Sequence, residues 1–165
     1  MLKKLFKKEA KVSEIRLVSP VEGETLPLED VPDPVFSQKM IGDGIAFLPR
    51  EGKVVAPADA IVTHIFTTKH AVALETAEGL ELLIHIGLDT VNMQGEGFSI
   101  HVAEGSQVKQ GDLLVTFDLK LIKKKATSSI TLIIITSGEI VQQLEHHYSS
   151  HSLAGETPVL IATIK

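Results

Sequence analysis

The sequence predicts an all-β protein, an antiparallel β sandwich or barrel-like fold with quasi-duplicated hairpins and one or two short helices. From Ser13 onward, short segments rich in β-branched residues alternate with turn sequences such as GDG, PREG, AEG and QGEG. Regular turn signals between short strands are typical of sandwiches and barrels. A Val-Xaa-Pro pattern also recurs, in VSPVEGETL (18–26) and VAPADAIVT (55–63), and each copy opens a turn before an apolar strand. We expect a single domain over residues 14–165.

The individual elements follow from runs of strand length and from capping signals. The predicted strands are Glu14–Val18, Gly44–Leu48, Lys53–Ala56, Ala60–Phe66, Ala71–Glu75, Leu80–Ile86, Asp112–Phe117, Ile130–Ile135 and Pro158–Ile164. The stretch AEGSQVKQGDLL (103–114) has the pattern of a hairpin. Two segments look helical: Asp118–Lys125, with Asp118 as the N-cap, and Glu139–His147.

Residues 1–13 differ from the rest of the chain. The first eleven, MLKKLFKKEAK, carry five lysines and one glutamate, hence a charge of +4. Leu2, Leu5 and Phe6 would share one face of a helix. Two interpretations stand: a flexible, solubilising leader, or a segment that makes weak contact with an anionic membrane surface. No secretory signal is visible, because a long apolar region and a cleavage site are missing.

The composition excludes several classes of function. With six Phe, one Tyr, no Trp and a net charge of −5, the chain lacks the stacking platforms and the basic surface of a nucleic-acid-binding protein. The absence of Cys excludes a thiol nucleophile, a disulfide framework and Cys-ligated zinc. The chain has no apolar run long enough to span a bilayer. We expect a cytoplasmic location.

The stretch LLIHIGL (82–88) places a histidine in an apolar run. Side chains alternate between the faces of a strand, which divides this stretch into two sets: Leu82, Ile84, Ile86 and Leu88 on the core face, and Leu83, His85 and Gly87 on the other. A buried imidazole costs free energy unless it is hydrogen-bonded. We therefore expect His85 on the outer face, with open space beside Gly87. This pattern alone does not separate a functional histidine from an incidental exposed one.

His70 strengthens the functional interpretation. In IFTTKHAVAL, the residues Phe66, Thr68 and His70 would share one face, and the Thr68 hydroxyl could hold one ring nitrogen of His70 and fix its tautomer. A hairpin turn at Ala77–Gly79 would set residue i opposite about 156 − i, which puts His70 level with Ile86 and near His85. The remaining histidines are expected to be structural or exposed; they are His64, His101, His146, His147 and His151.

Three chemistries compete for two adjacent histidines. A zinc centre needs at least three protein ligands; Asp89 could be the third, but no His-Xaa-His pair occurs in the chain. A lipoyl or biotinyl carrier needs a lysine at a hairpin tip, and the Thr-Lys-His setting of Lys69 does not suit one. In the third chemistry, phosphoryl transfer, a neutral imidazole is a good nucleophile near pH 7. A second imidazole can then donate a hydrogen bond to the phosphoryl oxygens.

GLELLIHIGLDTV (79–91), continued by GEGF (95–98), resembles the phosphorylation-site signature of the glucose-type enzyme IIA of the bacterial sugar phosphotransferase system. EDVPDPVFSQKMIGDGIA (29–46), VVAPADAIV, EGSQVKQGDLLVTFDL and GETPVL resemble the same family in the same order, so the resemblance runs from about residue 14 to 165.

The resemblance implies roles for particular residues. His85 would be phosphorylated on Nε2, with its Nδ1–H bonded to the backbone carbonyl of Gly87. His70, oriented by Thr68, would contact the phosphoryl group. The phosphoryl donor would be the small carrier HPr, and the acceptor a cysteine on the IIB domain of a IIB/IIC sugar permease. The resemblance implies no cofactor and no metal, and we expect a monomer.

The family's apolar docking surface would map onto Val35, Phe36, Ile41, Phe66, Leu83 and Val91. Pro34 and Leu83 depart from the family pattern, as do the missing proline after the threonine of ITLIII and the segment Glu145–His151. None of these departures involves the two histidines. Asp89 has the wrong sign to hold phosphate, so we expect it to form a local ion pair or to tune release of the phosphoryl group.

Overall fold

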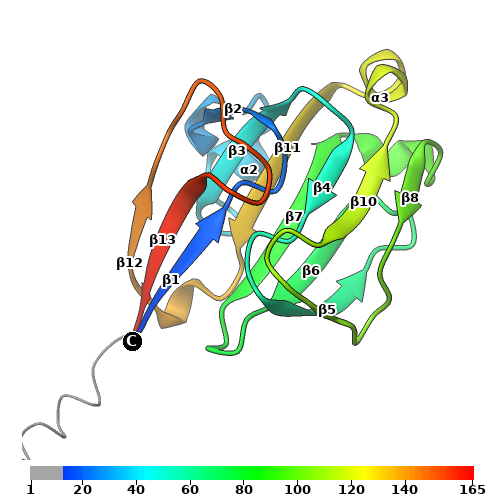
Figure 1. Cartoon of the computed structure of the whole chain (residues 1–165). Coiled ribbons are helices and arrows are strands. Elements are labelled where there is room, and N and C mark those ends of the chain that lie inside the picture. The colour runs from blue at the N-terminus through cyan, green and yellow to red at the C-terminus, as the bar shows by residue number, and fades with distance from the viewer. Residues whose placement is uncertain (1–12) are drawn as a thin grey trace, which may run out of the picture.

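The computed structural model describes residues 13–165 and contains three antiparallel sheets (Figure 1). One three-stranded sheet has the order β1 (Ser13–Val18), β13 (Pro158–Ile164), β12 (Val141–His146), and a second has the order β4 (Lys53–Val55), β10 (Leu113–Phe117), β8 (Phe98–Ile100). The seven-stranded sheet has the order β2 (Gly23–Leu26), β3 (Gly44–Pro49), β11 (Ser128–Ile135), β7 (Glu81–Leu88), β6 (Ala71–Glu75), β5 (Ala60–Ile65), β9 (Gln107–Val108). The predicted antiparallel β sandwich is confirmed.

Helical structure is short. The helices are α2 (Pro34–Ser37) and α3 (Leu119–Lys125), and the 3-10 turns are η1 (Leu28–Asp30), η2 (Thr90–Met93) and η3 (Gly138–Ile140). Within residues 13–165, no helix is long and apolar enough to cross a membrane.

The recurring Val-Xaa-Pro pattern corresponds to a structural duplication. Val18 ends β1 and Val55 ends β4, so each copy leaves a strand at the same point. The two turns bind one another reciprocally: Val18 N–H donates to the Pro57 carbonyl at 2.9 Å, and Val55 N–H donates to the Pro20 carbonyl at 2.8 Å. The quasi-duplicated units are therefore joined by equivalent hydrogen bonds.

The seven-stranded sheet is buried on both faces over part of its width. Along β11, Ile133 and Ile135 belong to the main core cluster, which also contains residues of both smaller sheets. Leu132 and Ile134 face the other way, into a second cluster with Phe36 of α2. A strand buried on both faces needs a continuous apolar run, which explains the sequence ITLIII at residues 130–135.

Two of the sequence-based predictions concern helices. The one over Asp118–Lys125 is confirmed: Asp118 caps α3, and its carboxylate accepts from Leu121 N–H at 3.1 Å. The one over Glu139–His147 is wrong, since this segment forms η3 and strand β12. Val141–His146 pairs with β13, and these cross-strand contacts override the weak helical pattern of the segment.

The hairpin prediction over residues 103–114 is also wrong. β9 pairs with β5 at the edge of the seven-stranded sheet, whereas β10 lies between β4 and β8 in another sheet. The turn at Gly111 is present, but the two strands leave it for different partners. The sequence analysis missed the short elements β2, β8, β9 and α2. Ser13 begins β1 rather than ending the leader, and residues 1–12 lie outside the described part of the chain.

Candidate functional site

His85 lies on the outer face of β7, as predicted. Leu82, Ile84 and Ile86 are buried in the main core, while Leu83 and His85 are half-buried on the opposite face. The prediction for Leu88 is wrong, because this residue packs in the second cluster rather than in the main core. Gly87, at φ +79°, leaves strand geometry and breaks the alternation just before Leu88.

The pairing of β6 with β7 brings His70 beside His85. Ala71 is opposite His85 in the register, and Ile86 N–H donates to the His70 carbonyl at 2.8 Å, so the predicted sum of 156 holds. The two imidazoles meet edge to face, with ring centroids 4.9 Å apart and an interplanar angle of 84°. As whole residues, His70 is 5% exposed and His85 is half-buried.

Thr68 makes the predicted contact with His70, but it lies in a turn rather than in a strand. Its hydroxyl lies 2.7 Å from His70 Nδ1. Phe66, Thr68 and His70 do not share a strand face, since they lie in the tight turn between β5 and β6, closed by a hydrogen bond from Lys69 N–H to the Phe66 carbonyl. The turn still directs the Phe66 ring toward His70, with centroids 5.8 Å apart.

Gly87 is required by close packing rather than by open space beside His85. A Cβ at this position would lie 2.3 Å from Thr90 Cγ2, and φ +79° disfavours any L side chain. Among the described residues, buried His85 Nδ1 has no hydrogen-bond partner. The Gly87 main chain nevertheless acts on the ring by raising its pKa, so the bond to the Gly87 carbonyl stays a prediction.

The environment keeps both rings neutral. Burial is the main reason why the pKa of His85 falls to about 4, and the charge of a protonated His70 lowers it further, while the Gly87 main chain and Asp33 oppose the shift. Burial also lowers the pKa of His70, against a hydrogen bond to the Thr68 main chain. The sequence analysis missed Asp33, whose carboxylate caps α2 by accepting from Val35 N–H at 3.0 Å. The Asp-Pro signal of a helix start was present in the sequence.

Phe36 packs against His85 from the buried side of the site. Its ring lies 5.0 Å from the His85 ring, and the residue is only 6% exposed. The expectation that Phe36 is part of an open docking surface therefore needs correction: α2 packs it into the second cluster, where it shields His85 from water.

The other predicted docking residues differ in their exposure. Val35, Ile41 and Val91 are exposed, at 40%, 41% and 48%. Phe66 and Leu83 are half-buried. The sequence analysis missed Met40, which is 69% exposed beside Ile41. A large exposed apolar side chain in the segment of Val35 and Ile41 would have been a usable signal.

Asp89 is held by a neutral partner. It lies directly before η2 at φ +64°, and its carboxylate accepts a hydrogen bond from the Thr127 hydroxyl. The expected ion pair is not formed with any residue that the structure describes. Over residues 13–165, no group of three or more His, Asp or Glu side chains is arranged to hold a metal ion, so His70, His85 and Asp89 do not form a ligand set.

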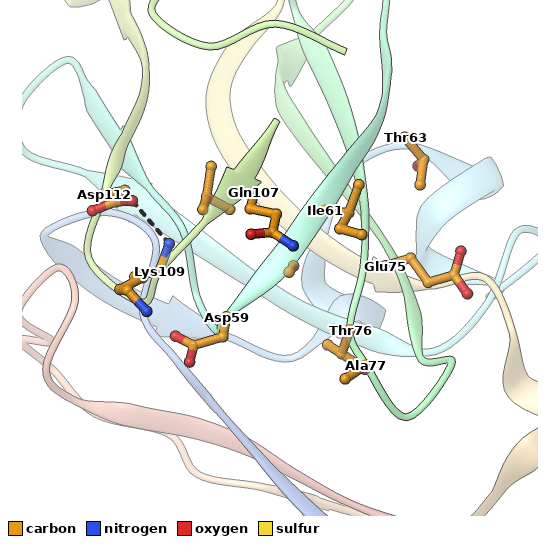
Figure 2. A pocket seen from close by; sticks show the side chains of 11 residues that line it. Asp59, Ile61, Thr63, Glu75, Thr76, Ala77, Gln107, Lys109 and Asp112 are labelled. Carbon is orange, nitrogen blue, oxygen red and sulfur yellow. Dashed lines mark hydrogen bonds between the residues drawn. The ribbon is translucent and has the colours of Figure 1, made fainter. Parts of the chain in front are cut away.

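A groove of about 680 Å³ lies elsewhere, along β5, β6 and β9 (Figure 2). It is lined by residues such as Asp59, Ile61, Glu75 and Lys109, and by none of the predicted site residues. The histidine pair instead lies on the outer face of the sheet, beside the half-buried side chains of Phe66 and Leu83. Such a surface suits a reaction with a group presented by another protein better than one with a small molecule enclosed in a cavity.

Comparisons with known proteins find a family and relatives that match most of the chain. Residues 15–141 match the family model of the phosphoenolpyruvate-dependent sugar phosphotransferase system, EIIA 1. The chain is 50% identical over 161 residues to the PTS system glucose-specific EIIA component of Oceanobacillus iheyensis, covering 97% of this chain and 98% of that one. It is 55% identical over 125 residues to the glucosamine-specific EIICBA component of Bacillus subtilis, covering 76% of this chain and 20% of that one.

A solved structure is also similar. The glucose permease IIA of Mycoplasma capricolum superimposes with a TM-score of 0.80 at 35% sequence identity, covering 90% of this chain and 96% of that one. The similarity therefore extends from the sequence to the arrangement of the sheets.

Proposed function

The chain belongs to the EIIA 1 family of the phosphoenolpyruvate-dependent sugar phosphotransferase system, and we propose that His85 Nε2 carries the phosphoryl group. The observation that supports this assignment most is the neutral, half-buried His85 ring set edge to face against His70. A ring whose pKa is about 4 retains a free nitrogen lone pair at neutral pH.

In the proposed reaction, His85 Nε2 attacks the phosphorus atom of phospho-HPr. The new N–P bond forms as the donor's N–P bond breaks, and that electron pair returns to the donor's imidazole. No net proton transfer is needed, since each ring keeps the proton on its other nitrogen. In the second step a cysteine thiolate of a IIB domain attacks, an S–P bond forms, and the N–P electron pair returns to His85. Because the donor brings the phosphoryl group already activated, the reaction needs no cofactor.

His70 supports this reaction without becoming phosphorylated. When its Nδ1 accepts from the Thr68 hydroxyl, Nε2 carries the proton and can donate it to a phosphoryl oxygen. A donor that is already in place where negative charge develops stabilises the transition state. Phosphorylation makes the His85 ring cationic and strengthens Nδ1–H as a donor, which favours a closer hydrogen bond to the Gly87 carbonyl.

The exposed apolar residues around the pair would seat HPr and then the IIB domain of the IIB/IIC permease. The apolar anchors of this surface are Val35, Ile41 and Val91, with Phe66 and Leu83 completing it. Asp89, bonded to Thr127, would tune release of the phosphoryl group through its negative charge. A cysteine-free chain is compatible with the reducing cytoplasm, where we propose that it works as a monomer. Contact of residues 1–11 with a membrane lies outside the described residues.

The experiment is a two-stage transfer assay with radiolabelled phospho-HPr. Wild type should gain one acid-labile phosphoryl group and pass it to a IIB domain, and His85→Ala should gain none. A His101→Ala variant, which alters a histidine bonded to Thr116 Oγ1 at 2.9 Å, is the control and should transfer normally. Persistent labelling of folded His85→Ala would overturn the proposal.

A further inference from the structure

Lys69 has an unfavourable backbone conformation beside the histidine pair. Its φ of +64° lies in the left-handed region, which costs a residue with a Cβ about 1 kcal/mol or more. Asn or Gly would adopt this conformation more readily. The shape of the turn between β5 and β6 therefore does not require a lysine. The presence of the Lys69 side chain needs another explanation.

The stem of Lys69 runs along the rim of the site. Lys69 comes between Thr68 and His70, and its Cγ, Cδ and Cε atoms pass over Gly95, where an added Cβ would lie 3.6 Å from Cδ. Gly95 follows η2, the turn that presents Val91. The side chain thus bridges two elements of the site, and Lys69 is exposed at its edge.

Lys69 differs from two other lysines of the described chain, which are held in ion pairs. Lys39 forms ion pairs with Glu29 at 3.1 Å and with Asp43 at 3.5 Å. Lys125 pairs with Glu96 at 2.7 Å. The ammonium of Lys69 has no such partner in the described chain, so a partner's anionic group can reach it without displacing an existing contact.

We propose that Lys69 determines docking specificity: its ammonium pairs with a carboxylate on a protein that exchanges the phosphoryl group with His85. This inference rests on the proposed function. A charge at the rim of an interface acts mainly on the rate of encounter and on its salt dependence, whereas a charge that contacts the reacting phosphoryl group acts on the chemical step. These two consequences can be measured separately.

The test uses three variants in transfer assays with phospho-HPr and with a IIB domain. Lys69→Asn removes the charge and keeps the left-handed turn, and Lys69→Arg keeps the charge. Lys109→Asn is the control, since it removes an exposed lysine of the distant groove. Lys69→Asn should raise KM for one or both partners about threefold at low salt with unchanged kcat, and this difference should vanish at about 0.5 M salt. Lys69→Arg should restore the wild-type KM.

Two results would overturn the inference. One is a KM in Lys69→Asn that equals that of Lys109→Asn at low salt. The other is a lower kcat, or a changed half-life of the phosphohistidine, with KM unchanged; this would mean that Lys69 contacts the phosphoryl group rather than a partner's carboxylate. Failure of the proposed function looks different, because wild type itself would then carry no label on His85.

Discussion

Two groups of histidines in this protein differ in their surroundings. His70, in the turn before β6, meets His85 of β7, and neither has a carboxylate within ion-pair distance among the described residues. Four others each lie beside a carboxylate: His64 by Glu104 at 3.0 Å, His146 by Asp43 at 3.4 Å, His147 by Glu145 at 3.4 Å and His151 by Glu22 at 2.6 Å.

This difference separates a reactive imidazole from a structural one. A carboxylate within 4 Å of the ring repels a phosphoryl dianion that approaches the same ring. At His85, which has no carboxylate within 4 Å among the described residues, burial lowers the pKa to about 4 and leaves the ring neutral with a free nitrogen lone pair. Both groups lie close to other side chains, so the presence of a carboxylate within ion-pair distance distinguishes them.

Among these comparisons, the largest difference in transfer rate is expected between a variant of His70 and a variant of His64, one of the histidines beside a carboxylate. His70→Gln should slow phosphoryl transfer about 100-fold while His85 still becomes labelled, because a stabilising donor is lost and the nucleophile remains. His64→Gln, which alters the ion pair with Glu104, should transfer within about twofold of wild type. Rapid-quench kinetics with phospho-HPr measures both. Equal rates for the two variants would remove the distinction between the groups.

A smaller effect concerns the shielding by Phe36. NMR titration should show wild-type His85 protonating near pH 4, and Phe36→Leu should move the midpoint toward 6.5, since water gains access to the ring. Because the unfolded chain binds this proton near pH 6.5 and the folded protein near pH 4, the free energy of unfolding should fall as pH decreases through this interval. Phe117→Leu, in the Phe98–Phe117 pair, should leave the midpoint in place. An unchanged midpoint in Phe36→Leu would assign the shift to other groups.

The smallest effect tests orientation by a hydroxyl. Thr68→Val removes the bond to His70 Nδ1 at 2.7 Å and should slow transfer a few-fold, since one hydrogen bond is worth about 1 kcal/mol. Thr116→Val removes the comparable bond to His101 Nε2 at 2.9 Å and should leave the rate unchanged. Should Thr68→Val transfer as fast as Thr116→Val, the tautomer of His70 would not depend on Thr68.

Much of the site was predictable because it lies on adjacent strands. The alternation of side chains along β7 predicts that His85 lies on the face opposite to that of Ile84 and Ile86. The turn at Ala77–Gly79 predicts the register that brings His70 beside His85. Both inferences need only local geometry. The resemblance to a known family supplied the roles and most of the surrounding surface.

The errors arose where distant segments decide the outcome. The prediction for Leu88 was wrong because Gly87 has φ +79° and packs closely against Thr90, and the alternation of strand faces reveals neither feature. Val141–His146 became a strand because β13 offered an unpaired edge. Phe36 was expected at the surface, but the second cluster, which packs α2 and η1 on the sheet, buries it.

The most direct test of the central claim is the position of the phosphoryl group itself. Protein labelled with ¹⁵N in its histidine rings and phosphorylated by phospho-HPr should show ¹⁵N–³¹P coupling to one nitrogen, Nε2 of His85, assigned by its absence in His85→Ala. Coupling to a nitrogen of His70, or to any histidine that lies beside a carboxylate, would contradict the account.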